Sequence, residues 1–351
     1  MSRKVTIQPS FEISSLFKYK NENMKENNFH LYKSGRYALF FGLKKLLEIS
    51  PTLKDIYIPT FVCPQVLMPI EKLDLDQKFY QIDKTLSLDK KYLSNSVNAN
   101  SIVIVINYFG FPSDWEYFNE LKLKTGCTLI ADNCHSMLSA YKGRNLSEYG
   151  DLSFNSFRKI LPVLSGSQLF FNNKKYQLDS EAQTRIPSLS ELLYMMRSLK
   201  PGFIKKHLGD TKLVGNYRPD GNNKYFFDEE SINTIDIISK NYFLSSMENY
   251  KNINVRRREN YMSWLNFLPA SDFIFLNELK LINNITPYVF PCIARNEGIM
   301  KRWISWGHDK NISIINWPNK RDDLDNNLRL MLLFPIVPNQ DIKLVLENAS
   351  K

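Results

Sequence analysis

Four polar side chains in the middle of the chain could share one chemical task. Asp132 and His135 follow an apolar run that ends at Ala131, and Ser156 and Lys159 follow a second apolar run. A lysine amine can form an imine with an aldehyde and can move a proton. A carboxylate can keep a ring nitrogen protonated, and a hydroxyl can donate to a phosphate. Pyridoxal phosphate (PLP) needs these groups from a protein, so the stretch predicts a PLP site.

Each of these residues also has a plainer interpretation. Lys159 could be a surface lysine, Asp132 a turn or capping residue, and His135 a hydrogen-bonded core histidine. Lys159 is favoured by its neighbours, since Ser156 lies three positions before it and the turn at Gly166 follows it. Asp132 is favoured by its place at the end of a predicted strand.

Predicted strands alternate with predicted helices over the first half of the chain. The strands are expected at residues 55–58, 78–82, 101–108, 128–131 and 168–172, and the helices at 37–49, 62–70 and 114–125. The run at 101–108 reads SIVIVINY, which is typical of a strand covered on both faces. The alternation predicts a doubly wound α/β domain with a mostly parallel sheet. Ligands bind such sheets at the carboxyl ends of the strands, where Asp132 stands.

The turn at Ser34-Gly35 opens the first predicted helix. The first backbone N–H groups of a helix lack partners inside it, and they lie at the positive end of its dipole. The turn therefore predicts a phosphate seat, although Ser34 could also be no more than a helix cap.

The pattern divides the chain into three parts. Residues 1–30 are polar and predict an arm, residues 31–250 a large α/β domain, and residues 251–351 a small α+β domain. In the later part, helices are expected at 189–199, 228–240, 252–268, 298–306 and 341–348, strands at 288–294 and 330–334, and a surface loop at 200–224.

Composition limits the class of protein and of partner. The chain has 351 residues and a net charge of +10, which favours an anionic partner. No apolar run approaches the roughly 20 residues of a membrane span, and the N-terminus lacks the apolar segment of a signal peptide, so a cytoplasmic protein is expected. The densest basic cluster, Arg256-Arg257-Arg258, is predicted on a solvated helix face. A nucleic-acid-binding protein is a competing interpretation, but basic and aromatic residues do not interleave.

The four cysteines are scattered. Cys63, Cys127, Cys134 and Cys292 form no Cys-x-x-Cys pair and have no spacing typical of zinc. They are expected to be reduced and mostly buried, and no metal site is predicted.

Several short motifs follow one another in a characteristic order. They are Ser34-Gly35-Arg36-Tyr37-Ala38-Leu39, Ile58-Pro59-Thr60-Phe61, Asn107-Tyr108-Phe109-Gly110-Phe111-Pro112, Ala131-Asp132-Asn133-Cys134-His135, Tyr141-Lys142-Gly143-Arg144, Tyr149-Gly150-Asp151 and Ser156-Phe157-Arg158-Lys159. In this order they resemble the signatures of the DegT/DnrJ/EryC1/StrS family of sugar aminotransferases. A weaker similarity continues through Arg257-Arg258-Glu259-Asn260-Tyr261 to Phe334-Pro335-Ile336.

The resemblance implies a PLP fold-type I enzyme, usually a homodimer with active sites at the subunit interface. It implies transfer of an amino group from glutamate to a nucleotide-linked keto-sugar, as in surface polysaccharide biosynthesis. Carried over by position, it assigns the imine to Lys159, the ring nitrogen to Asp132, the ring or its hydroxyl to His135, and the phosphate to Ser156 and the backbone of Gly35, Arg36 and Tyr37. Lys142 lies in a loop motif and is not the imine lysine.

The chain also departs from the family pattern. Arg158 alone separates Phe157 from Lys159, where the family has three residues, and Ser165-Gly166-Ser167 replaces an acidic residue and paired glycines. Asn216-Tyr217-Arg218 resembles a segment that reaches into the partner's site, and either Phe61 or Cys63 takes the place of an aromatic against the ring. Family members that deoxygenate sugars carry histidine at the lysine position, so Lys159 argues against that reaction. The shortened lysine loop leaves open a catalytically silent binding or scaffold protein.

Overall fold

The computed structural model describes residues 4–9, 29–176, 184–189, 191–192, 233–247, 250–276, 279–282, 284–317 and 328–349. The predicted loop at 200–224, which includes Asn216-Tyr217-Arg218, lies outside these ranges, as does most of the predicted helix at 189–199. Within the described ranges, none of the helices is both long and apolar enough to cross a membrane.

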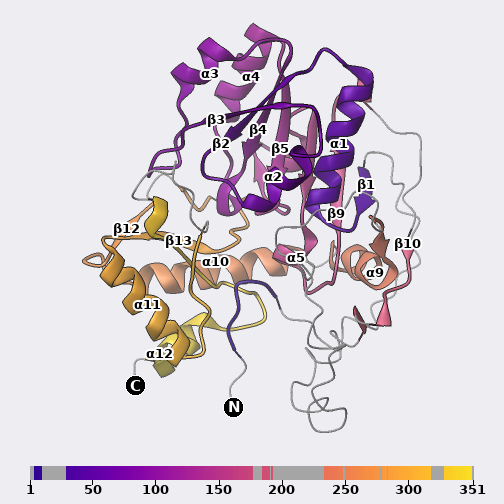
Figure 1. The fold of residues 1–351 in the computed structure, drawn as a ribbon. Coiled ribbons are helices and arrows are strands. Elements are labelled where there is room, and N and C mark those ends of the chain that lie inside the picture. Colours follow the sequence, from indigo (N-terminus) through magenta and orange to yellow (C-terminus); the bar gives the residue numbers. More distant parts are fainter. Residues whose placement is uncertain are drawn as a thin grey trace.

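A seven-stranded sheet forms the centre of the larger body in Figure 1, in the order β1-β9-β8-β5-β4-β2-β3. All its strands run parallel except β9, which is antiparallel to both of its neighbours. This confirms the predicted α/β class with a mostly parallel sheet. The strands are β1 (Phe29–Tyr32), β2 (Asp55–Pro59), β3 (Asp76–Tyr80), β4 (Ser101–Ile106), β5 (Thr128–Asn133), β8 (Leu152–Asn155) and β9 (Ser167–Phe171).

Helices and tight turns connect these strands. Local sequence signals fix both ends of α4. Asp114 accepts a hydrogen bond from Tyr117 N at its start, and Gly126 ends it with φ of 75°. α1 packs on β1, β8 and β9. The helices are α1 (Gly35–Ile49), α2 (Pro64–Ile70), α3 (Lys90–Ser96), α4 (Trp115–Thr125) and α5 (Phe157–Ile160), with 3-10 turns at Tyr108–Gly110, Leu146–Glu148 and Lys174–Tyr176.

A second sheet is antiparallel, in the order β12-β13-β15-β14. Its β12 and β13 lie at the lower left of the large sheet in Figure 1, and α10 contacts β13. Its strands are β12 (Phe273–Phe275), β13 (Phe290–Ala294), β14 (Ile315–Asn316) and β15 (Met331–Phe334). The helices around it are α10 (Tyr250–Phe267), α11 (Glu297–Asp309), the 3-10 turn Leu328–Leu330 and α12 (Ile342–Ala349). Near the N-terminus, Val5 pairs with Ile312. The proposed domain boundaries remain a prediction.

Several predicted elements differ from the structure. Phe29 and His30, which fall within the predicted arm, form the start of β1 and pair with β9. Of the helix predicted at 228–240, residues 228–232 lie outside the described ranges and residues 233–236 are not helical; a helix begins at Ile237, where Asp236 caps it by accepting from Ser239 N at 2.8 Å. That helix is α9 (Ile237–Ser246), and β10 (Thr184–Arg185) pairs with β11 (Ile235–Asp236) before it. The hairpin of β6 (Ala140–Tyr141) and β7 (Arg144–Asn145) was not predicted.

The basic cluster on α10 is not a single solvated face. Arg256 is exposed and pairs with Glu259, but Arg257 is fully buried. The helix turns by about 100° per residue, so three successive arginines cannot share one face. The prediction of a solvated cluster was therefore wrong for Arg257.

Gly166 is required by its conformation and by its surroundings. Its φ is +128°, and a Cβ built there would lie 2.2 Å from Cδ2 of Phe157. Gly143 also has a positive φ, +79°, but nothing lies within 4 Å of its Cβ position. We expect Gly166→Ala to lower the free energy of unfolding by about 3 kcal/mol and Gly143→Ala by about 1 kcal/mol, since the first adds a clash to the backbone strain. Denaturant unfolding measures both, and equal losses would contradict the clash.

Candidate active site

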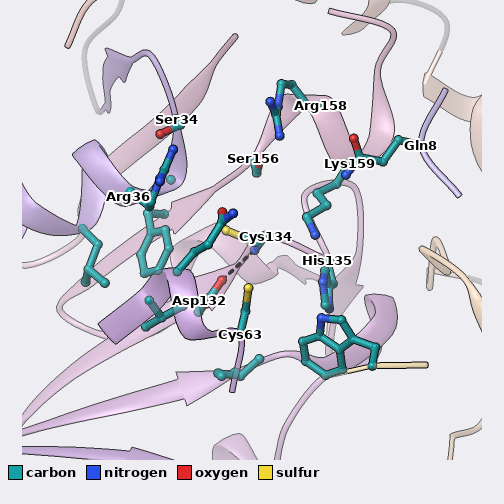
Figure 2. Close-up of a pocket in the computed structure, with 17 residues that line it drawn as sticks. Gln8, Ser34, Arg36, Cys63, Asp132, Cys134, His135, Ser156, Arg158 and Lys159 are labelled. Atoms are coloured by element: carbon teal, nitrogen blue, oxygen red, sulfur yellow. Dashed lines mark hydrogen bonds between the residues drawn. The ribbon is translucent and has the colours of Figure 1, made fainter. Parts of the chain in front are cut away.

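A pocket opens at the carboxyl ends of the parallel strands, with an empty volume of about 950 Å³, open solvent at its mouth included. The predicted site residues come from strands and helix starts that lie far apart in sequence, and all of them except Tyr37 line this pocket. In Figure 2, Ser34 and Arg36 lie on one side, Lys159 and His135 on the other, and Asp132 with Cys134 between them. The structure thus brings the predicted residues together, while their individual roles remain predictions.

Asp132 lies at the bottom of the pocket, inside β5 rather than after it. The strand extends to Asn133, and Asp132 pairs in register with Ile106 and Phe154 on the neighbouring strands. The side chain is 4% exposed, and Oδ1 accepts from Cys134 N at 2.9 Å. Burial raises the pKa of Asp132, against the lowering effects of this hydrogen bond and of Lys159. A cationic ring nitrogen at this carboxylate would oppose the effect of burial.

His135 is held between two aromatic rings. Its ring stacks on Phe109, with centroids 5.7 Å apart, and on Tyr288, with centroids 4.7 Å apart. The side chain is 6% exposed, and Nδ1 is buried with no hydrogen-bond partner. Burial, and next the charge of Lys159, hold the pKa of His135 well below its usual value. The imidazole is therefore neutral, with a fixed ring plane and one unsatisfied nitrogen.

This depressed pKa makes the stability of the free protein depend on pH. The unfolded state takes up a proton at His135 below about pH 6.5 and the folded state does not, so stability is present above that pH and is lost as the pH falls. We expect the wild type to lose about 1.4 kcal/mol per pH unit more than His135→Phe between about pH 6 and pH 5. Phenylalanine keeps the stacking on Phe109 and Tyr288 but does not titrate. Denaturant unfolding across this range measures the difference, and parallel curves would contradict a buried neutral His135.

Lys159 projects from a single helical turn, not from a loop. β8 ends at Asn155, Ser156 is the N-cap of α5, and Lys159 lies in that turn with Nζ 5.2 Å from the ring centroid of Tyr288. Phe157 anchors the turn by stacking on Phe243, with centroids 4.1 Å apart. The short spacing between Phe157 and Lys159 is therefore built as one turn of helix that places the amine in the pocket.

Opposing effects act on the pKa of Lys159. Burial is the largest of them and lowers the pKa, but Tyr288, Cys63 and Cys134 together leave it above its usual value.

The start of α1 forms the opposite side of the pocket. Ser34 occupies the N-cap position, yet its side chain makes no capping hydrogen bond and its Oγ is buried without a partner. Ser34 is therefore the N-cap residue of α1 by its backbone, but its side chain does not cap the helix. Gly35 allows a close approach here, since a Cβ would lie 3.0 Å from Cys134 Sγ. Tyr37 does not line the pocket, and its N–H donates to Ser34 O at 3.1 Å.

These features fit a phosphorylated aldehyde of a pyridine. The unsatisfied Ser34 Oγ, the hydroxyl of Ser156 and Arg36 could hold a phosphate, since hydroxyl, guanidinium and helix N-terminal N–H groups are its usual partners. Asp132 could hold the ring nitrogen, and the unsatisfied His135 Nδ1 lies on the same lining. No group of three or more His, Cys, Asp or Glu in the described part of the chain could hold a metal ion.

Sequence reasoning missed several residues of the pocket. Gln8 reaches it from the N-terminal segment, and Trp317 lines it with Cys63 and Cys134. Of the two candidates for the ring-facing position, Cys63 lines the pocket, whereas Phe61 is fully buried against Trp317, with ring centroids 4.9 Å apart. Gln8 and Trp317 carry no local sequence signal, because long-range contacts place them: Val5 pairs with Ile312, and the Trp317 ring packs on Phe61 and His135. All four cysteines are free, as predicted, and two of them are buried.

Residues 29–177 match the sequence model of the DegT/DnrJ/EryC1/StrS aminotransferase family. The match covers 149 of the 351 residues, less than half of the chain. The matched segment includes Gly35, Asp132 and Lys159, so it supplies most of the pocket described above.

Two curated proteins are similar to part of the chain. The chain is 25% identical over 123 residues to the GDP-4-keto-6-deoxy-D-mannose 3-dehydratase of Yersinia pseudotuberculosis, covering 34% of this chain and 30% of the relative. It is 27% identical over 151 residues to the UDP-4-amino-4,6-dideoxy-N-acetyl-beta-L-altrosamine transaminase of Campylobacter jejuni, covering 40% and 36%. The similarity thus spans about a third of the length of these relatives.

Solved structures share the fold over nearly the whole chain. A Helicobacter pylori aminotransferase involved in pseudoaminic acid biosynthesis matches with a TM-score of 0.70 and 13% identity, covering 99% of this chain and 98% of that one. The GDP-4-keto-6-deoxy-D-mannose 3-dehydratase of Escherichia coli with bound hydrated PLP matches with a TM-score of 0.66 and 14% identity, covering 97% and 93%. At these identities the likeness establishes the fold.

Proposed function

We propose that the protein is a PLP-dependent aminotransferase that moves an amino group from glutamate to a nucleotide-linked keto-sugar. The observation that carries this proposal is the convergence of Lys159, Asp132 and His135 on one pocket. Ser34 and His135 support it, because both residues line the pocket and each carries a polar atom without a hydrogen-bond partner.

Each residue has a defined task in this proposal. Ser34, Ser156 and the first N–H groups of α1 would hold the phosphate, and Asp132 would hold the ring nitrogen. PLP, when bound, would supply an electron sink for the carbon that loses its proton. Lys159 would hold the aldehyde carbon of the cofactor and, as a free amine, would carry the proton between the substrate carbon and the cofactor.

The charge of the pocket supports an anionic substrate. Arg36, Arg158 and Lys159 all line it, and the chain carries a net charge of +10. A nucleotide-linked sugar carries a diphosphate, and guanidinium groups suit phosphate oxygens. We further propose a homodimer and a role in surface polysaccharide biosynthesis, as the family resemblance implies.

Sugar deoxygenation is a second candidate, because two of the proteins compared above are 3-dehydratases. The retained Lys159 argues against it. A third candidate is a silent binding or scaffold protein with the same fold.

One experiment separates these candidates. The purified protein is incubated with PLP, glutamate and a panel of GDP- and UDP-linked keto-sugars, and products are identified by mass spectrometry. We expect an amino sugar together with 2-oxoglutarate. A deoxysugar without incorporated nitrogen would identify a dehydratase, and a protein that binds no PLP would support the scaffold role.

A further inference from the structure

A buried guanidinium, that of Arg257, joins two backbone segments behind the pocket. Its Nη1 donates to the carbonyl oxygens of Tyr288 at 2.9 Å and Pro287 at 3.3 Å. Its Nη2 donates to the carbonyl oxygens of Lys159 at 3.4 Å and Ile160 at 3.5 Å. One side chain of α10 is therefore bonded both to the lysine turn and to the segment before β13.

The lysine turn, α5, needs hydrogen-bond donors from outside the helix. α5 has four residues, and the last carbonyl oxygens of any helix lack donors within it. Arginine side chains can satisfy these oxygens and interact favourably with the negative end of the helix dipole. Arg257 thus supports the end of the turn that carries Lys159.

The second segment carries the ring that faces the amine. The Tyr288 ring centroid lies 5.2 Å from Lys159 Nζ and 4.7 Å from the ring of His135. Because Arg257 bonds the backbone of both Tyr288 and Lys159, it fixes the amine relative to this stack of rings.

The burial of Arg257 is costly. The side chain is 0% exposed, and Nε has no hydrogen-bond partner. In the part of the chain that the structure describes, its hydrogen bonds go to carbonyl oxygens and to no carboxylate. Burial lowers its pKa to about 10, so it remains charged at neutral pH. An unpaired buried charge opposes folding, so an apolar residue of similar volume would stabilise this position more than arginine does. Packing therefore does not explain the arginine.

We infer that Arg257 is a positioning residue, which sets the place of the Lys159 amine against Tyr288 and His135 through these backbone hydrogen bonds. The inference rests on the proposed function for its effect on transfer. Its effect on the amine itself can be measured without any cofactor.

The test compares Arg257→Met and Arg257→Lys with Arg256→Met. Arg256 is the adjacent, exposed arginine of the same helix, so it controls for loss of one positive charge. In the protein without PLP, trace acetylation of Lys159 across a pH series, followed by peptide mass spectrometry, gives the pH of half-maximal labelling. The groups that face the amine stay the same in all variants: Asp132, His135, Cys63, Cys134, Arg158 and Tyr288.

We expect the labelling midpoint of Arg257→Met to move towards that of an ordinary lysine. With PLP and substrates, kcat should fall on the order of 10²-fold while KM changes less than about threefold, because the loss is one of alignment. The midpoint and kcat of Arg257→Lys should lie between those of the wild type and Arg257→Met. An ammonium keeps the positive charge, but it lacks the planar group of donors that bonds both pairs of carbonyl oxygens. Arg256→Met should match the wild type.

A folded Arg257→Met with the wild-type midpoint and kcat would overturn the inference. A lower melting temperature with an unchanged midpoint and kcat would also overturn it, because Arg257 would then be merely structural. If Arg257→Met does not fold, wild-type values in Arg257→Lys would have the same meaning. If the wild type itself transfers no amine, the proposed function fails, and the labelling midpoints still decide the role of Arg257.

Discussion

Lys159→Ala is expected to lower the rate of amino transfer by at least about 10⁴-fold, because it removes both the amine that holds the cofactor and the amine that moves the proton. Among the described residues that line the pocket, Lys159 is the one lysine, so no other lysine of that lining can replace its amine. Single-turnover kinetics with saturating PLP, glutamate and the preferred keto-sugar measures the loss.

The matched control is Lys142→Ala. Lys142 belongs to another motif of the same family segment, but it is exposed and forms a surface ion pair with Glu116. Such pairs contribute about 0–1 kcal/mol to stability, so transfer should remain within about twofold of the wild type. Equal losses in both variants would remove Lys159 from its proposed role.

Asp132→Asn is expected to lower kcat on the order of 10³-fold, because the amide cannot hold a positive charge on a ring nitrogen. The amide oxygen can still accept from Cys134 N, so the local backbone keeps its hydrogen bond. Steady-state kinetics and the affinity for PLP measure the effect, and kcat within threefold of the wild type would contradict the role of Asp132.

The same substitution should stabilise the protein without cofactor. Burial raises the pKa of Asp132, so the folded state binds this proton more tightly than the unfolded state. Stability from this group is therefore present below about pH 4 and is lost as the pH rises through the raised pKa. At neutral pH the wild type carries an unfavourable buried carboxylate that Asp132→Asn lacks. A higher melting temperature of the free variant at pH 7, with less gain from added PLP, is the expected result.

Part of the pocket lining could be predicted because its signals are local. Asp132 follows an apolar run in a pattern of alternating strands and helices, and such a run ends where ligands bind. Lys159 could be found from its neighbours Ser156 and Gly166. The sequence did not reveal that the short spacing between Phe157 and Lys159 forms a single helical turn. That turn is supported by the stacking of Phe157 on Phe243, a residue distant in sequence.

The burial of Arg257 has a signal in the sequence, which is the spacing of the residues on its helix face. The buried positions of α10 are Arg257, Asn260, Tyr261 and Trp264, which is the spacing of one helix face. The apolar residues of that stripe already indicate which arginine of the cluster lies inside. Gln8 and Trp317 differ, since neither local pattern nor spacing connects them to the pocket and only the three-dimensional fold does.

The most direct test of the account is to find where the protein attaches PLP. The wild-type protein is mixed with PLP, reduced with borohydride to make the attachment permanent, digested, and mapped by peptide mass spectrometry. We expect one modified peptide, containing Ser156-Phe157-Arg158-Lys159 with the label on Lys159, and no such label in Lys159→Ala. A label on Lys142 or spread over surface lysines, with Lys159 unmodified, would contradict it.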